Sequence, residues 1–160
     1  PGVAPVLLVA NGSYQLAQLE RAAERLKTHG VGYRLVYIQE PGRLRQARDA
    51  YEAEVVLASD LIAEFFPAHY TYRVVLTHMR PEVFRGHLVR LLPQAQQCQV
   101  LGYINRGGTL DEFGMLFANR STWAHAIEAY AQLSQAELTL FLDAEETAAV
   151  QGRGQPAVLR

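Results

Sequence analysis

Residues 99–123 read QVLGYINRGGTLDEFGMLFANRSTW, and this stretch decides the fold that the sequence predicts. Its first apolar run, 100–104, predicts a short strand that ends in a polar turn around Gly107 and Gly108. A second apolar run, 115–118, follows after a connection too short for a crossover helix, so it predicts an antiparallel strand. The two glycines either serve the geometry of this turn alone or let a ligand approach the backbone closely.

The rest of the chain alternates between strand and helix patterns. Further strands are predicted where apolar residues run between turn residues, at 6–10, 33–38 and 73–77. Residues 54–57 fit either a strand or the end of a helix. Helices are predicted from apolar spacing and end signals at 16–26, 43–51, 61–66, 81–92, 122–133 and 135–150. This alternation predicts an α/β fold, a three-layer sandwich around a mostly parallel or mixed sheet of about five strands.

Length and composition limit what the chain can be. Residues 1–160 have the length and apolar content of a single domain, and 151–160 is expected to be a loose tail. The 15 Lys and Arg residues nearly balance 16 Asp and Glu residues, which argues against a surface for nucleic acid. No apolar run reaches the roughly 20 residues of a membrane helix, and the first residues lack the pattern of a signal peptide. The single cysteine, Cys98, excludes an internal disulfide and is expected to be a packing residue. We therefore expect a cytoplasmic protein that binds neither nucleic acid nor membrane.

Several motifs that carry chemistry are missing from the sequence. Gly30 and Gly32 follow a predicted helix, so they do not form a dinucleotide-binding fingerprint. Ser13 follows Gly12, but Gln15 occupies the second glycine position of a nucleophile elbow. The five histidines are scattered without carboxylates at ligand spacing, which argues against a metal site. The residues alone therefore predict no catalytic group in this chain.

Polar residues follow two predicted strands, 73–77 and 100–104, directly. Because the carboxyl ends of parallel strands meet at one edge of a sheet, we expect these residues to converge there. Arginine side chains and glycine amides would suit an anion, either on a phosphate-bearing ligand or on an acidic surface of another domain. Alternatively, the arginines pair with Asp111 and Glu112 and leave the edge neutral. The candidate anion-binding residues are His78, Arg80, Asn105, Arg106, Gly107, Gly108 and Thr109.

One block of the sequence, 102–120, joins Gly-Tyr-Ile-Asn-Arg-Gly-Gly-Thr to Met-Leu-Phe-Ala-Asn-Arg. It resembles the Gly-Tyr-x-x-x-Gly-Thr and Met-Val-Val-Leu-Asn blocks in the C-terminal domain of phosphoketolases, thiamine-diphosphate enzymes of the transketolase superfamily. The resemblance extends over residues 6–131, because more generic α/β blocks match the same domain in the same order. These blocks are 6–26, 34–38, 59–66 and 73–78.

The sequence also departs from this family. Where the family has Gly-Tyr-Pro-Trp after a histidine, this chain has Met79-Arg80-Pro81-Glu82 after His78. Where the family has a run of threonines, Thr109 is followed by Leu110-Asp111-Glu112. The residues after Leu133 do not match the longer, lysine-rich ending of the family. The resemblance therefore implies a divergent member.

The resemblance implies a role within a larger enzyme. A full-length phosphoketolase-like lyase would cleave xylulose 5-phosphate or fructose 6-phosphate with phosphate, giving acetyl phosphate and an aldose phosphate. Its thiamine diphosphate and Mg would be bound by preceding domains, where the family carries its Gly-Asp-Gly and downstream Asn motif; this chain has no such motif. The chain would then be a C-terminal domain with a transketolase C-terminal-domain-like fold, inactive alone and contacting the preceding domains and a second subunit of a homodimer. A start at Pro1, without methionine, fits this expectation. The alternative is a stand-alone small-molecule-binding or regulatory α/β domain without catalysis.

Overall fold

A sheet of four parallel strands forms the centre of the molecule, with strand order β2-β1-β3-β4. The structure is a computed structural model that describes residues 4–91, 97–104 and 108–160. The strands are β1 (Val6–Asn11), β2 (Tyr33–Tyr37), β3 (Tyr72–Thr77) and β4 (Cys98–Leu101). Each neighbouring pair is parallel, with Leu8 beside Leu35 and Val74. The predicted α/β fold is confirmed, but the sheet has four strands where about five were expected and contains no antiparallel member among the described residues.

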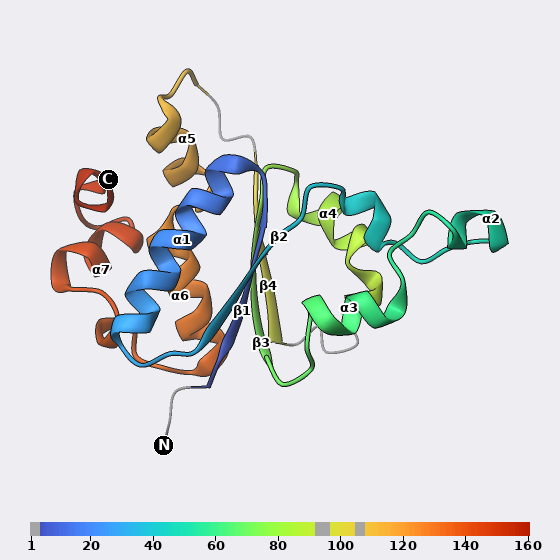
Figure 1. The fold of residues 1–160 in the computed structure, drawn as a ribbon. Helices are drawn as coiled ribbons and strands as arrows, with labels where there is room; N and C mark the ends of the chain where they lie inside the picture. The colour runs from blue at the N-terminus through green and yellow to red at the C-terminus, as the bar shows by residue number, and fades with distance from the viewer. Residues whose placement is uncertain (1–3, 92–96, 105–107) are drawn as a thin grey trace.

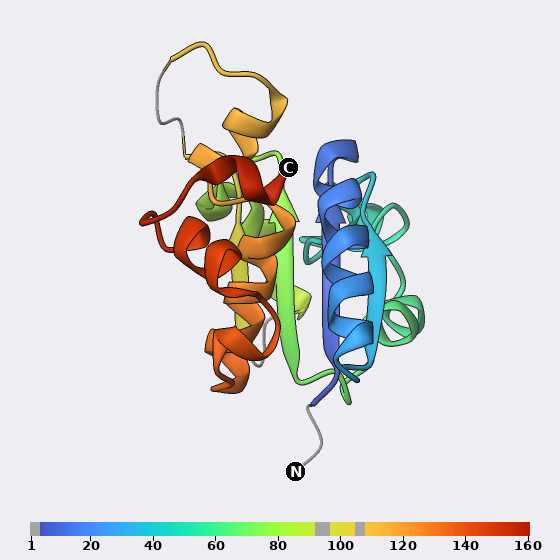
Figure 2. The same cartoon turned by 90° about the vertical axis from the view of Figure 1, so that its left-hand side faces the viewer.

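Helices cover both faces of this sheet (Figure 1). One face carries α1 (Ser13–Thr28) and α6 (Trp123–Ser134), with α7 (Ala144–Val150) packed outside them (Figure 2). The other face carries α3 (Ser59–Phe65) and α4 (Pro81–His87). These layers make β1 the most deeply buried strand, since it pairs on both sides and is covered on both faces.

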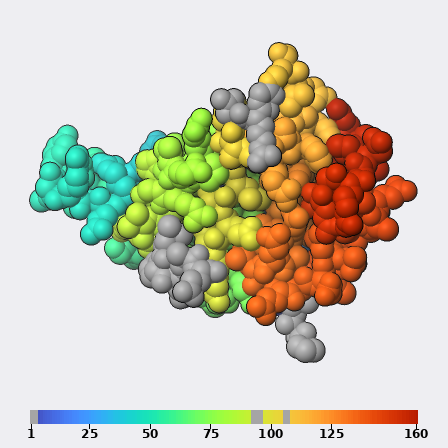
Figure 3. Space-filling model, turned by 180° about the vertical axis from the view of Figure 1, so that it is seen from behind, coloured from blue at the N-terminus to red at the C-terminus, as the bar shows by residue number. Residues whose placement is uncertain are grey.

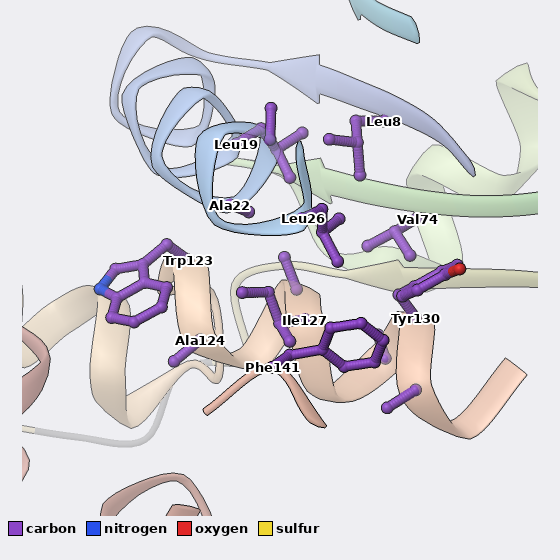
Figure 4. Packing of buried hydrophobic residues seen from close by; sticks show 14 of the residues in the cluster. Leu8, Leu19, Ala22, Leu26, Val74, Trp123, Ala124, Ile127, Tyr130 and Phe141 are labelled. Carbon is purple, nitrogen blue, oxygen red and sulfur yellow. The ribbon is translucent and has the colours of Figure 1, made fainter. Parts of the chain in front are cut away.

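Successive side chains of β1 point to opposite faces of the sheet, and this alternation divides the core into two clusters. Val6, Leu8 and Ala10 face α1 and α6, whereas Leu7 and Val9 face the α3 and α4 side. In the first cluster the side chains of Leu26, Ile127 and Tyr130 close over the sheet (Figure 4). Each fully buried leucine or isoleucine in such a cluster stabilises the fold by about 1.5–3 kcal/mol.

The connection from β2 to β3 is less regular than the sequence predicts. The expected helix at 43–51 is wrong: the chain forms a 3-10 turn, η1 (Pro41–Leu44), and a single helical turn, α2 (Ala50–Ala53). This region stands away from the sheet (Figures 1 and 3), and the side chain of Glu52 holds it through ion pairs with Arg45 and Arg48. Without a sheet surface to cover, the segment has no apolar face that would favour a longer helix. The predicted helix 81–92 is likewise divided into α4 and a 3-10 turn, η2 (Val89–Leu91).

The predicted antiparallel strand at 115–118 is also wrong, because these residues lie in α5 (Glu112–Ala118). The carboxylate of Asp111 accepts a hydrogen bond from the backbone N–H of Gly114 at 2.7 Å and caps the helix. Phe113 and Phe117, four residues apart, stack on one face with ring centroids 6.1 Å apart. The cap and the helical spacing of the aromatic residues therefore favour a helix over a strand.

Residues 135–160 pack more closely than the sequence predicts. The expected helix 135–150 is divided into η4 (Leu138–Leu140) and α7, and Asp143 and Glu146 form a capping box at the start of α7. The expected loose tail 151–160 instead forms η5 (Pro156–Leu159), with Leu159 fully buried. The indole Nε1 of Trp123 donates to the carbonyl oxygen of Leu159 at 2.8 Å. Within the described residues, no helix combines the length and the apolar composition needed to span a membrane.

We predict that the packing of η5 against α6 contributes measurably to the stability of the fold. Leu159→Ala should lower the free energy of unfolding by about 2–4 kcal/mol, because it leaves a cavity beside α6 while keeping the backbone oxygen that Trp123 binds. Val158→Ala is the control, since that side chain is 39% exposed and its loss should change stability by less than about 0.5 kcal/mol. Urea denaturation of both variants measures the difference. Equal stability of the two variants would contradict the docked arrangement.

Candidate functional site

The strand order places a topological switch point between β1 and β3. The chain leaves β1 for β2 on one side and then returns across β1 to β3 and β4 on the other side. The helices that follow β1 and β3, which are α1 and α4, consequently cover opposite faces of the sheet (Figure 1). In open α/β sheets, ligands bind in the crevice that such a divergence leaves at the carboxyl ends of the strands.

Asn11, the last residue of β1, is the buried partner of Thr77 in the floor of this crevice. Its side chain is 2% exposed and makes two hydrogen bonds, donating through Nδ2 to the carbonyl oxygen of Ile38 and accepting through Oδ1 from the hydroxyl of Thr77, each at 2.9 Å. Its carbonyl oxygen accepts from the backbone N–H of His78 at 2.9 Å. Asn11 thereby fixes the ends of β2 and β3 against the end of β1.

A cavity of about 400 Å³ opens above this floor. Its walls come from the first turn of α1, the end of β3, and α5 with the turn that follows it. Representative lining residues are Tyr14, Gln15, His78, Met115, Leu116 and Ser121. The volume lies within the range of small-molecule sites, and most of the wall is apolar.

The start of α1 supplies the free polar groups of this cavity. Gln15 is 8% exposed and lines the cavity, and its carboxamide makes no hydrogen bond to any described residue. Gly12 precedes the helix with a φ of +114°. A Cβ at this position would stand 2.3 Å from the oxygen Oε1 of Gln15. The backbone angle therefore favours glycine at position 12, and a side chain there would displace the carboxamide of Gln15.

No side chain caps α1, and its first turn contains no acidic residue. The first backbone hydrogen bond of the helix is donated by Leu16 to the carbonyl oxygen of Gly12. The N–H groups of Ser13, Tyr14 and Gln15 have no acceptor among the described residues. The positive end of a helix of 16 residues is thus available at the strand ends.

The structure brings one of the candidate residues of the sequence to this cavity. His78 lies at its rim, with Nδ1 at 3.1 Å from the carbonyl oxygen of Asn11. Arg80 is exposed at the start of α4 and does not line the cavity, and Gly108 and Thr109 are exposed in the connection to α5. The other candidates lie outside the described residues: Asn105, Arg106 and Gly107.

The sequence leaves open that the arginines at this edge pair with Asp111 and Glu112, and the structure shows a different partner for Asp111. Asp111 pairs with Arg160, with Oδ2 and Nη2 at 2.6 Å, rather than with Arg80. This hydrogen bond, together with the one from Gly114, lowers the pKa of the Asp111 carboxyl. Glu112 lines the cavity from the first turn of α5.

Asn119 holds the wall of the cavity in place. It is buried, and its Oδ1 accepts from the backbone N–H of Ile104 at 2.7 Å while its Nδ2 donates to the carbonyl oxygen of Met115 at 2.9 Å. Asn119 therefore joins the segment after β4 to α5. Both of its polar groups are occupied, so Asn119 is a structural residue of the site.

The buried titratable groups near the site are not arranged for catalysis. His125 on α6 is buried beside Phe117, and its Nδ1 lies 2.8 Å from the hydroxyl of Thr122. Burial, with a smaller effect of Arg120, lowers the pKa of His125 to about 3. Cys98 is buried as predicted, and burial raises the pKa of its thiol, so it is a packing residue rather than a nucleophile. No cluster of three or more His, Cys, Asp or Glu side chains suited to a metal occurs in the described parts of the chain.

A second and larger hollow, of about 530 Å³, follows the edge strand β2. Its buried lining residues, Ile38, Leu44 and Phe66, are all apolar. It follows the outer edge of the sheet, from Arg34 on β2 to Gln39 and Glu40 just after that strand, and so lies away from the switch point between β1 and β3. The switch-point cavity is therefore the better candidate for a functional site.

Comparison with known protein families finds no family that matches this chain, and curated proteins give no significant match either. The class of protein that fold and site define is an α/β domain with a cavity at its switch point.

We predict that the neutral state of His125 makes stability depend on pH. The unfolded chain protonates this histidine near its ordinary pKa of 6.5, whereas the folded chain protonates it only near 3, so acidification favours the unfolded state between these values. Lowering the pH from 7.5 to about 5 should cost about 2 kcal/mol through this residue. His125→Gln should remove this part of the pH dependence, measured by urea denaturation at a series of pH values. The exposed His69→Gln is the control and should keep the wild-type slope; a wild-type slope in His125→Gln would refute the assignment.

Proposed function

We propose that this chain is a non-catalytic binding domain, the C-terminal domain of a phosphoketolase-like enzyme. The observation that carries the proposal is the switch-point cavity, which combines apolar walls and free polar groups with no nucleophile and base in contact among its described residues. Such a lining suits recognition of a ligand rather than a reaction.

The resemblance of 102–120 to phosphoketolases gives the biological setting of the proposal. In that setting the complete lyase cleaves xylulose 5-phosphate or fructose 6-phosphate, and thiamine diphosphate and Mg are bound by the preceding domains. The present domain contributes contacts to those domains and to a second subunit of a homodimer. The α/β fold supports this setting only at the level of architecture, because one fold serves many functions.

A stand-alone binding or regulatory domain is the second candidate, because the cavity needs no residue from another domain to form its described walls. The native gene separates the two candidates. Several hundred codons before Pro1 that encode a Gly-Asp-Gly and downstream Asn motif would support the enzyme domain. A start codon directly before Pro1 would support the stand-alone domain.

We predict that the isolated 160-residue chain neither binds thiamine diphosphate nor produces acetyl phosphate from fructose 6-phosphate and phosphate. The reason is that its described residues hold no metal cluster and no catalytic pair, and its sequence lacks the cofactor motif. Titration calorimetry with thiamine diphosphate and Mg²⁺, together with an acetyl phosphate assay, measures both properties, and the complete enzyme is the positive control. Tight binding of thiamine diphosphate by the isolated chain would refute the proposed division of labour.

A further inference from the structure

We propose that the switch-point cavity recognises a small phosphate ester, with the phosphate held by the free N–H groups at the start of α1 and by the carboxamide of Gln15. The inference deepens the proposed binding function and rests on it. It also changes the location of the anion site, from the arginines expected after β3 and β4 to the turn after β1.

The first step of the argument is the helix start. Ser13, Tyr14 and Gln15 present backbone N–H groups without acceptors among the described residues, at the positive end of a helix of 16 residues. A phosphate oxygen can accept several such hydrogen bonds at once, and the helix dipole adds to the attraction. The first turn contains no acidic side chain that would already satisfy this end of the helix.

The second step is independent of the helix and concerns the side chain of Gln15. It is 92% buried yet unpaired among the described residues, and it faces the cavity. Its amide nitrogen can donate a hydrogen bond to a ligand in the cavity, so the side chain is available for a bound group.

The third step is the remainder of the wall, which defines the body of the ligand. Leu110, Met115 and Leu116 provide an apolar surface, and the hydroxyl of Ser121 and the carboxylate of Glu112 lie among the lining groups. A carboxylate repels a phosphate but accepts hydrogen bonds from hydroxyl groups. We therefore place the phosphate at α1 and the hydroxyl-bearing part of the ligand toward α5. A cavity of about 400 Å³ has room for a molecule of the size of a sugar phosphate.

The experiment compares fructose 6-phosphate with fructose and with inorganic phosphate, using amide NMR spectra of the wild-type chain. Fructose 6-phosphate and phosphate should shift the amide signals of Ser13, Tyr14 and Gln15, and fructose should bind at least about tenfold more weakly than its phosphate ester, as expected for the loss of charge-assisted hydrogen bonds. Shifts confined to the exposed Arg80 region would overturn the proposed location.

Two pairs of variants test the individual groups. Ser13→Pro removes one N–H at the first helical position, where proline is well tolerated, and should weaken binding of fructose 6-phosphate about tenfold. Ser13→Ala keeps that N–H and should bind like the wild type. Gln15→Leu should also weaken binding, whereas Gln46→Leu, at an exposed glutamine, should not. Thermal melting checks that each variant is folded, and the wild-type NMR titration decides the question if a variant is not.

The outcomes distinguish this inference from the function on which it rests. Equal binding of fructose and fructose 6-phosphate, or unchanged affinity in both Ser13→Pro and Gln15→Leu, would overturn the phosphate site and leave a binding cavity. Absence of any amide shift at the cavity with all three compounds would count against both the phosphate site and the proposed binding function. Binding to α1 by phosphate but not by its ester would overturn the ligand class and keep the anion site.

Discussion

The hydrogen bonds of Asn11 are the constraint on which the candidate site depends. This one buried side chain joins the carbonyl oxygen of Ile38 to the hydroxyl of Thr77, and its backbone oxygen binds the N–H of His78. The side chain thereby joins the ends of three neighbouring strands at one level, in addition to the backbone pairing that aligns them along their length. Each unpaired buried polar group costs about 1–3 kcal/mol. Because Asn11 pairs with groups on both neighbouring strands, asparagine suits this position far better than an apolar residue of similar size.

Two glycines allow the chain to pass close to this network. A Cβ at Gly102 would stand 2.4 Å from the carbonyl oxygen of Met79 and 2.8 Å from the Cγ2 of Thr77, so the segment leaving β4 can approach the end of β3 only with glycine. The backbone N–H of Tyr103 then donates to the same oxygen of Met79 at 3.0 Å. Gly12 similarly leaves room for the carboxamide of Gln15. Gly102 belongs to the block that resembles phosphoketolases, and close packing alone explains its presence in this chain.

The sequence predicts the strands better than it predicts the site, for physical reasons. Strands such as β1 and β3 are buried on both faces, and their continuous apolar runs between turn residues show this directly. The run 115–118 has the same composition, but the cap of Asp111 and the spacing of the aromatic residues make it a helix. His78, one of the polar residues expected at the strand ends, lines the cavity. Gln15 is missed because its burial depends on its place in the cavity between the start of α1, the end of β3 and α5, a tertiary arrangement that no local pattern reveals. A polar residue in the first turn of a helix after a buried strand is the signal that could have indicated it.

The floor and the outer wall of the cavity are held by interactions of different strength. The floor is held by the buried hydrogen bonds of Asn11, whereas Leu116 is the one buried residue of α5. The outer end of α5 is held by the ion pair of Asp111 with Arg160, both more than half exposed, and by the guanidinium of Arg160 over the ring of Phe113 at 4.6 Å. Exposed ion pairs and exposed cation–π contacts contribute little to stability, because solvent screens them. Arg160 is in turn positioned by Leu159, whose burial beside Trp123 is the stronger interaction. The outer wall is therefore held by weaker and more exposed interactions than the strand ends at the floor.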